Sequence, residues 1–233
     1  TKDVKEIKYN LEEIEKGGYE HFMLKEINEQ AHTISETIRG RVNKETMQVM
    51  LGGIYDWVQQ ILDANYITIT ACGTSWHAAL IGSYILEELL HVPVKVEYAS
   101  EFRYRETAVN GNSVVICVSQ SGETADTLAA IKKAKEKGAL TLGIVNVVGS
   151  SIARETHCGV YIHAGPEIGV ASTKAFTAQV TIFNLIGILL AQKKGGSTEM
   201  IKNIINDLES LPGLVQSVLD HGNEVLPIAT DFI

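Results

Sequence analysis

Five short apolar runs that alternate with helix-like segments constrain the fold of this chain most. Three of the runs are nearly continuous, as in strands buried on both faces of a sheet. Segments with helical character lie at 75–90 and 123–137, with shorter ones near 100–107 and 150–155. This alternation predicts a doubly wound α/β domain with a five-stranded parallel sheet flanked by helices. The predicted strands lie within "YITITACG" (66–73), "VKVEYAS" (94–100), "SVVICVSQ" (113–120), "TLGIVNV" (141–147) and "VYIHAG" (160–165).

Helical patterns flank this core on both sides. Apolar residues recur at helical spacing in residues 21–40 and are followed by Gly40 as a stop signal, and a second helix is predicted for 53–62. The first stripe consists of Met23, Ile27, Ala31, Ile34 and Ile38. Two more helices are predicted after the fifth strand, at 173–192 and 197–211, the second with a stripe of Met200, Ile201, Ile204, Ile205 and Leu208. We expect a helical arm (1–65), an α/β domain (66–195) and C-terminal helices (196–233).

Charge, hydropathy and cysteine content argue against nucleic-acid binding, a membrane span and a disulfide framework. The formal net charge of −8 argues against nucleic acid, because phosphate backbones select basic surfaces. The longest apolar stretch, 180–191, contains a threonine and an asparagine and is too short to span a bilayer. Cys72, Cys117 and Cys158 are odd in number and lie in or beside strand-like runs. This pattern favours reduced thiols in a cytoplasmic protein over a disulfide framework.

Three loops rich in Gly, Ser and Thr each lead from the end of a strand into the start of a helix. They are "ACGTSWHA" (71–78), "SQSGETADT" (119–127) and "AGPEIGVASTKAF" (164–176). In parallel sheets, ligands bind beyond the carboxyl ends of the strands, and unpaired N–H groups at a helix start attract anions. Further donors would come from the hydroxyls of Thr74, Ser75, Ser119, Ser121 and Thr124.

Each loop alone is also explained by ordinary helix capping, since Ser and Thr are common N-caps. In addition, Glu123 and Asp126 are predicted in the first turn of a helix, where they would repel an anion. The presence of three such loops at three strand ends nevertheless favours a phosphate or sugar-phosphate site.

Other chemistry has weaker support in the sequence. A nucleotide site is not indicated, because neither G-x-G-x-x-G nor a Walker motif occurs, and H-x-x-x-H and C-x-x-C metal spacings are missing too. Cys72 could be a nucleophile or a buried thiol. Lys174 could neutralise a phosphate, form a Schiff base or pair with a carboxylate, and Glu167 could act as an acid or base.

The three loop sequences together resemble the signature loops of the sugar isomerase (SIS) domain family. "CGTSWHA", "SQSGETADT" and "EIGVASTKAFTAQ", with "EKGGYEHFMLKEINEQ" and "ASEFRYR", are similar to the first SIS domain of the glutamine–fructose-6-phosphate aminotransferase (glucosamine-6-phosphate synthase) family. The resemblance implies a dimeric enzyme of amino-sugar biosynthesis that works without cofactor or metal. Such an enzyme makes glucosamine 6-phosphate from fructose 6-phosphate and ammonia released from glutamine.

The resemblance also implies site residues and missing parts. Sugar-phosphate contacts carry over to Thr74, Ser75, Ser119, Gln120, Ser121, Thr124, Val170 and Ser172. The glutamine-cleaving cysteine of the family belongs to a glutaminase domain before this segment. The catalytic glutamate, histidine and lysines belong to a second SIS domain after it. Both ends of the chain look cut, so we expect a sugar-phosphate-binding fragment whose own catalytic residues are unknown.

Two alternatives remain open at this stage. The chain could be a non-catalytic SIS module that senses a sugar phosphate, or part of a fructosamine-phosphate deglycase. A regulator that binds DNA is disfavoured by the acidic charge balance.

Overall fold

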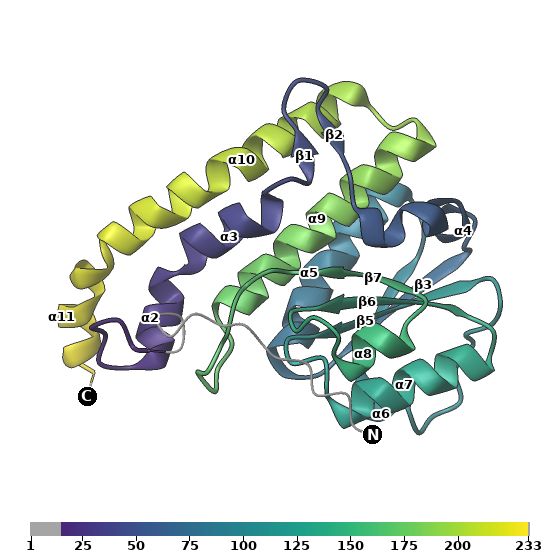
Figure 1. Ribbon diagram of the computed structural model, residues 1–233, viewed down its shortest axis with the longest axis horizontal. Helices are drawn as coiled ribbons and strands as arrows, with labels where there is room; N and C mark the ends of the chain where they lie inside the picture. Colours follow the sequence, from purple (N-terminus) through teal and green to yellow (C-terminus); the bar gives the residue numbers. More distant parts are fainter. Residues whose placement is uncertain (1–14, 233) are drawn as a thin grey trace.

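The predicted parallel sheet is present in the computed structural model, which describes residues 15–232 (Figure 1). All neighbouring strands of this sheet are parallel, and their order is β4-β3-β5-β6-β7. The strands are β3 (Tyr66–Ala71), β4 (Val94–Tyr98), β5 (Ser113–Ser119), β6 (Leu140–Val145) and β7 (Cys158–Tyr161). The chain forms β3, moves outward to the edge strand β4, and then returns past β3 to build β5, β6 and β7. The strand order therefore reverses between β3 and β5, where the fold class places ligands.

The sheet lies between two helical layers (Figure 1), and the side chains of β5 alternate between them. Val114, Ile116 and Val118 belong to the core formed with α5 (Gly73–Leu90) and α9 (Lys174–Lys194). Val115 and Cys117 face the opposite layer. That layer contains α6 (Ala99–Phe102), α7 (Ala125–Glu136) and α8 (Ser151–Glu155). Burial on both faces explains why the predicted strand reads as an unbroken apolar run.

Helix α9 is the central helix of the molecule. Among residues 15–232 it is the one helix long and apolar enough to cross a membrane, but most of it is buried inside the protein. It packs closely on α5, since a Cβ added to Gly82 would lie 2.4 Å from the ring of Phe183. Its apolar composition is therefore accounted for by its place between α5 and the N-terminal arm.

Within residues 15–65 the arm is only partly helical, which corrects the sequence prediction for that part of the chain. It contains α2 (Phe22–Asn28), α3 (Gln30–Ile38), the antiparallel pair β1 (Val42–Asn43) and β2 (Gln48–Val49), the 3-10 helix η1 (Gly52–Trp57) and α4 (Val58–Leu62). The Gln192 side chain of α9 holds the hairpin: its Nε2 donates to Met47 O (2.7 Å), and its Oε1 accepts from Val49 N (3.1 Å). The prediction for 1–14 lies outside the described residues.

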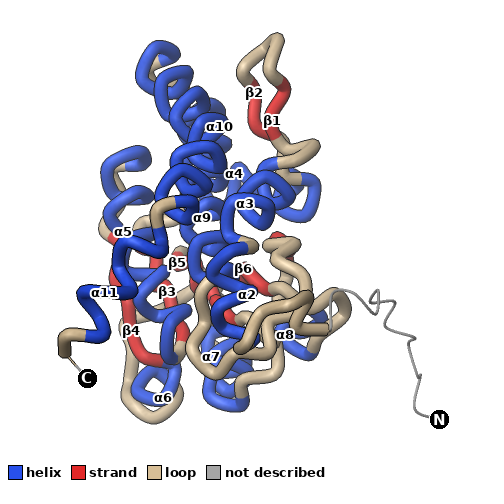
Figure 2. Tube along the Cα trace, turned by 90° about the vertical axis from the view of Figure 1, so that its left-hand side faces the viewer, coloured by secondary structure: helices blue, strands red, loops and turns tan. Residues whose placement is uncertain are grey.

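The C-terminal helix α10 (Thr198–Asp220) continues past Pro212, although the sequence predicted its end at residue 211. It runs beside α3, as Figures 1 and 2 show, and buries Ile201, Ile205 and Leu208 of the predicted stripe. Met200, from the same stripe, is exposed. The chain then passes through η2 (Gly222–Glu224) to α11 (Val225–Thr230).

Candidate functional site

The three predicted loops meet in one pocket of about 290 Å³ at the carboxyl ends of β3 and β5. It therefore lies at the point where the strand order reverses. All of the residues singled out from the sequence as sugar-phosphate contacts line it. The full lining is Cys72, Gly73, Thr74, Ser75, Val118, Ser119, Gln120, Ser121, Thr124, Glu167, Gly169, Val170 and Ser172. This set contains hydroxyl, amide, thiol and carboxylate groups but no lysine or arginine.

The first loop ends at Cys72, and α5 begins at Gly73. Ser75, in the first turn of that helix, accepts a hydrogen bond through Oγ from Gln179 Nε2 of α9 (3.0 Å). Gln179 is almost fully buried behind the pocket and was not predicted as a site residue. The available signal was an amide in a mostly apolar helix, since buried polar groups are hydrogen-bonded.

The second loop is folded around its own hydroxyls. Ser119 Oγ accepts from the Gly122 N–H (3.0 Å) and lies 3.0 Å from Thr124 Oγ1, while Ser121 Oγ accepts from the Glu123 N–H (3.2 Å). Gly122 has a φ of +69°, and a Cβ there would lie 2.1 Å from Ser150 Oγ, so this tight turn requires glycine. Ser119 is buried and organises the loop, whereas Ser121 is exposed at the pocket surface.

Side-chain capping does not account for the hydroxyls at α5 and α7. The N-cap residues are Cys72 and Thr124, and neither side chain accepts a hydrogen bond from its helix. By contrast, the N-cap Ser197 of α10 accepts from the Met200 N–H. The first-turn N–H groups of α5 and α7 are therefore not satisfied by their N-cap side chains. Both helices point these N-termini at the same pocket, where an anion is favoured.

The acidic residues next to the second loop are held by partners outside the pocket. Helix α7 begins at Ala125, so Glu123 lies before it and not in its first turn as predicted. Glu123 Oε1 accepts from the Ser151 N–H (2.7 Å). Hydrogen bonding to the side chain of Ser151 and then to its backbone lowers the pKa of the Glu123 carboxyl. Asp126 is in the first turn and pairs with Arg103 at 2.6 Å. Arg103 offsets the charge of Asp126, which weakens the expected repulsion of an anion.

The third loop crosses from β7 to the start of α9 and forms the remaining wall. Glu167 Oε1 accepts from the N–H groups of Thr173 (2.9 Å) and Ala175 (3.2 Å). These contacts are those of a carboxylate that caps α9, although Glu167 also lines the pocket. Lys174 does not line this pocket. It pairs with Glu29 of the arm at 2.7 Å, which is the carboxylate pairing among the three roles considered for it.

The cysteines differ in their environments. Cys72 lines the pocket, whereas Cys117 and Cys158 are buried, and all three are free thiols. Burial raises the pKa of Cys117 far above its usual range and that of Cys158 to about 12. Within residues 15–232, no group of three or more His, Cys, Asp or Glu side chains is arranged to hold a metal ion.

The SIS domain family model matches residues 60–189 of this chain. The chain belongs to the SIS domain family. Curated relatives of this SIS chain include the glutamine–fructose-6-phosphate aminotransferase (isomerizing) of Chlorobaculum tepidum, 54% identical over 98% of this chain and 37% of the relative. Another is glutamine–fructose-6-phosphate aminotransferase (isomerizing) 2 of Mus musculus, 45% identical over 99% and 34%. The SIS chain thus spans about a third of the length of these relatives.

Solved structures agree with this relationship. The C-terminal domain of glucosamine–fructose-6-phosphate aminotransferase from Francisella tularensis superposes with a TM-score of 0.85 at 36% identity, over 92% of the SIS chain and 60% of that domain. A putative phosphosugar isomerase from Silicibacter pomeroyi gives a TM-score of 0.66 at 24% identity, over 84% and 56%, and supports the fold alone. The chain therefore matches the SIS-containing isomerase part of an aminotransferase family.

Proposed function

We propose that this chain is the sugar-phosphate-binding part of the isomerase domain of a glutamine–fructose-6-phosphate aminotransferase. In the whole enzyme, fructose 6-phosphate and ammonia from glutamine would give glucosamine 6-phosphate. The observation that carries the proposal is the pocket in which the uncapped N-termini of α5 and α7 meet hydroxyls from two loops. The curated relatives, which are glutamine–fructose-6-phosphate aminotransferases, support it.

In this proposal the phosphate binds to the second loop. Ser121 and Thr124 supply hydroxyl donors, Gln120 supplies an amide, and the first-turn N–H groups of α7 point at the anion. Hydroxyls with oriented backbone amides can hold a phosphate without a basic side chain because the helix end carries partial positive charge. The sugar then extends between two further walls, formed by Thr74 and Ser75 on one side and by Val170 and Ser172 on the other.

The proposal also covers the parts of the parent enzyme. Residues 1–65 act as the arm, 66–195 as the first SIS domain, and 196–233 as helices that lead toward a second SIS domain. A glutaminase domain and that second SIS domain supply the ammonia and the acid–base groups. We place the enzyme in the cytoplasm.

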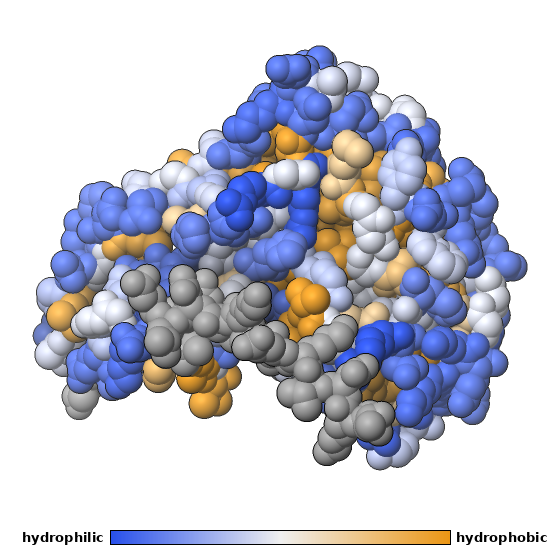
Figure 3. All heavy atoms as spheres, viewed as in Figure 1, coloured by the Kyte–Doolittle hydropathy of each residue, from blue (hydrophilic) through white to orange (hydrophobic). Residues whose placement is uncertain are grey.

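A homodimer is part of the same proposal. Large apolar side chains on the last helical elements are exposed, and Figure 3 shows apolar atoms at the end of the molecule where α11 lies. They are Leu214, Val218, Val225, Leu226, Ile228 and Phe232. Because exposed apolar patches of this kind mark interaction surfaces, we expect light scattering to give about twice the 25.4 kDa mass of the chain. A monomer at high protein concentration would contradict this.

Calorimetric titration tests the ligand proposal. The 233-residue chain should bind fructose 6-phosphate and also, more weakly, inorganic phosphate, and the two should compete. Fructose should not bind at the same concentrations because it lacks the anion that the helix ends attract. Amide NMR shifts caused by fructose 6-phosphate should centre on residues 119–125. Absence of binding, or shifts confined to another part of the chain, would refute the proposal.

A further inference from the structure

Helix α2 buries two charged residues and exposes two of its apolar ones. Lys25 and Glu26 are 7% and 2% exposed, whereas Met23 and Leu24, which precede them, are 43% and 45% exposed. A helix that packs on an apolar core shows the opposite pattern, and Met23, which belongs to the apolar stripe seen in the sequence, is exposed. Charged side chains are almost never fully buried unless they are paired. The buried face of α2 is therefore built around polar partners.

The partner of Glu26 is the tip of the third loop. Its Oε1 accepts from the N–H groups of Ile168 (2.6 Å) and Gly169 (3.0 Å), and its Oε2 lies 3.2 Å from the second of these nitrogens. A Cβ added to Gly169 would lie 2.5 Å from Glu26 Oε2, so a larger residue there would displace this carboxylate. One carboxylate thus binds two consecutive backbone amides next to Val170.

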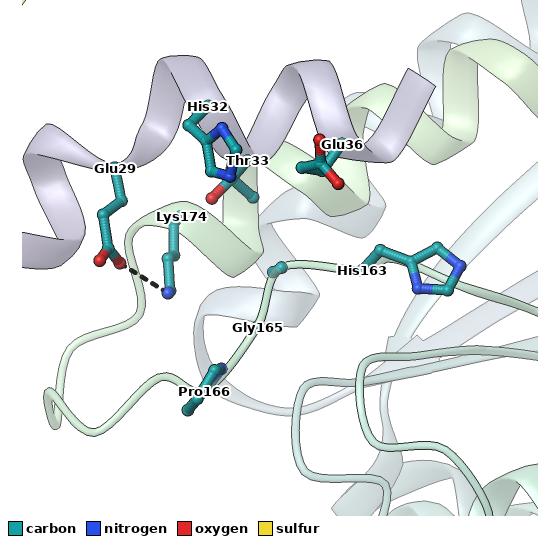
Figure 4. A pocket seen from close by; sticks show the side chains of 9 residues that line it. Glu29, His32, Thr33, Glu36, His163, Gly165, Pro166 and Lys174 are labelled. Carbon is teal, nitrogen blue, oxygen red and sulfur yellow. Dashed lines mark hydrogen bonds and ion pairs between the residues drawn. The ribbon is translucent and has the colours of Figure 1, made fainter. Parts of the chain in front are cut away.

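The end of the same loop is also held by the arm. Lys174, which is 4% exposed at the start of α9, donates to Glu29 Oε2 (2.7 Å). Figure 4 shows this contact bridging the arm helix and the start of α9, with the loop passing nearby at Gly165 and Pro166. The arm therefore fixes the loop at its tip and at its end.

Between these two anchors lie Val170 and Ser172, which line the pocket. The Val170 side chain is fully exposed, so its own packing does not set its position. Figure 3 shows the tip of this loop as an apolar protrusion. The position of this wall is consequently determined by backbone anchors, and the anchor at Gly169, which Glu26 binds, directly precedes Val170 in the sequence.

We infer that Glu26 is a positioning residue of the sugar-phosphate pocket, which holds the wall formed by Val170 and Ser172 opposite the phosphate-binding loop. This inference rests on the proposed function and adds a role for the arm, which holds the third loop through Glu26 and Glu29. Loss of the Glu26 carboxylate should therefore impair recognition of the sugar and spare recognition of the phosphate.

The test compares Glu26→Ala, Glu26→Gln and the control Glu20→Ala in the 233-residue chain. Glu20 lies on the same arm with an exposed carboxylate, 3.6 Å from His21. Glu26→Ala should bind fructose 6-phosphate at least about tenfold more weakly, because a lost hydrogen bond to a charged group changes an equilibrium by about that factor. Its affinity for inorganic phosphate should stay within about twofold of the unmodified chain, since the second loop is unchanged.

Glu26→Gln keeps one carbonyl oxygen for the two amides and should recover part of the affinity. It also replaces Glu26→Ala as the test variant if the alanine variant does not fold. Hydrogen exchange at the Ile168 and Gly169 amides should be at least about tenfold faster in Glu26→Ala than in Glu20→Ala, with the β5 amides unchanged. Unchanged exchange or unchanged sugar-phosphate affinity would overturn the inference, as would equal losses for sugar phosphate and phosphate. If the unmodified chain binds no sugar phosphate, the proposed function fails, while the exchange measurement still decides the role of Glu26.

Discussion

Replacing both Ser121 and Thr124 by alanine is expected to weaken binding of fructose 6-phosphate by at least about tenfold. Each hydroxyl would donate to a phosphate oxygen, and a hydrogen bond to a charged group contributes about 1.5–3 kcal/mol. The Ser121 oxygen already accepts from the Glu123 N–H, which leaves its proton free to be donated. Calorimetric titration of the double variant measures the loss directly.

The matched control is Ser210→Ala combined with Thr230→Ala. Both hydroxyls donate to carbonyls of their own helices, Ser210 to Asp207 O (2.9 Å) and Thr230 to Leu226 O (2.8 Å), and neither lines the pocket. The control should bind like the unmodified chain, and both variants should have the same far-UV circular dichroism spectrum. If the Ser121/Thr124 variant binds with undiminished affinity, the phosphate does not bind at the second loop as proposed.

The chain alone is expected to bind fructose 6-phosphate without isomerising it. Aldose–ketose interconversion requires a base that moves a proton between C1 and C2 and an acid that opens the ring. The ionisable side chains that line the pocket are Cys72 and Glu167, and Glu167 Oε1 is held by two N–H groups at the start of α9. General acid–base groups contribute about 10²–10⁴-fold each, so the lack of two places turnover below detection.

A coupled assay for glucose 6-phosphate measures this, with the full-length Chlorobaculum tepidum relative as the positive control. Turnover by the chain at a rate near that of the full-length enzyme would show that the acid–base groups lie within these 233 residues. Glu167→Gln would then identify the base, since it retains the capping oxygen and cannot take up the proton. Loss of turnover in that variant would assign catalysis to Glu167.

The sheet and the pocket could be predicted because their signals are local. An apolar run such as 113–119 can be buried on both faces only inside a layered α/β fold, and its carboxyl end then fixes where the next loop lies. The same reasoning predicted that the three loops lie close together at the carboxyl ends of the strands. All five strands and the α/β class of the fold were identified in this way.

The arm could not be predicted as well because its structure depends on distant partners. The hairpin at 42–49 is held by Gln192, and its turn lacks the Asn-Gly or Asp-Gly signal of a short hairpin. Glu26 gave no signal either, since a glutamate in a helix is normally solvated and its partners here are backbone amides at residues 168 and 169. A helical spacing of apolar residues predicts a helix that packs on apolar side chains. Helix α2 instead packs on the third loop, so this spacing did not identify its buried face.

The long sequence separations within the arm's contacts bear on the order in which the molecule folds. Thr37 Oγ1 donates to Ile162 O across 125 residues, and the Ile168 N–H donates to Glu26 across 142. Closing such long segments costs more conformational entropy than closing the short segment between β5 and β6, two paired strands that are joined by a single helix. The arm is therefore expected to dock after the sheet has formed. A chain with a finished sheet and an undocked arm would already present its phosphate loop, and its sugar wall would become ordered only in the last step.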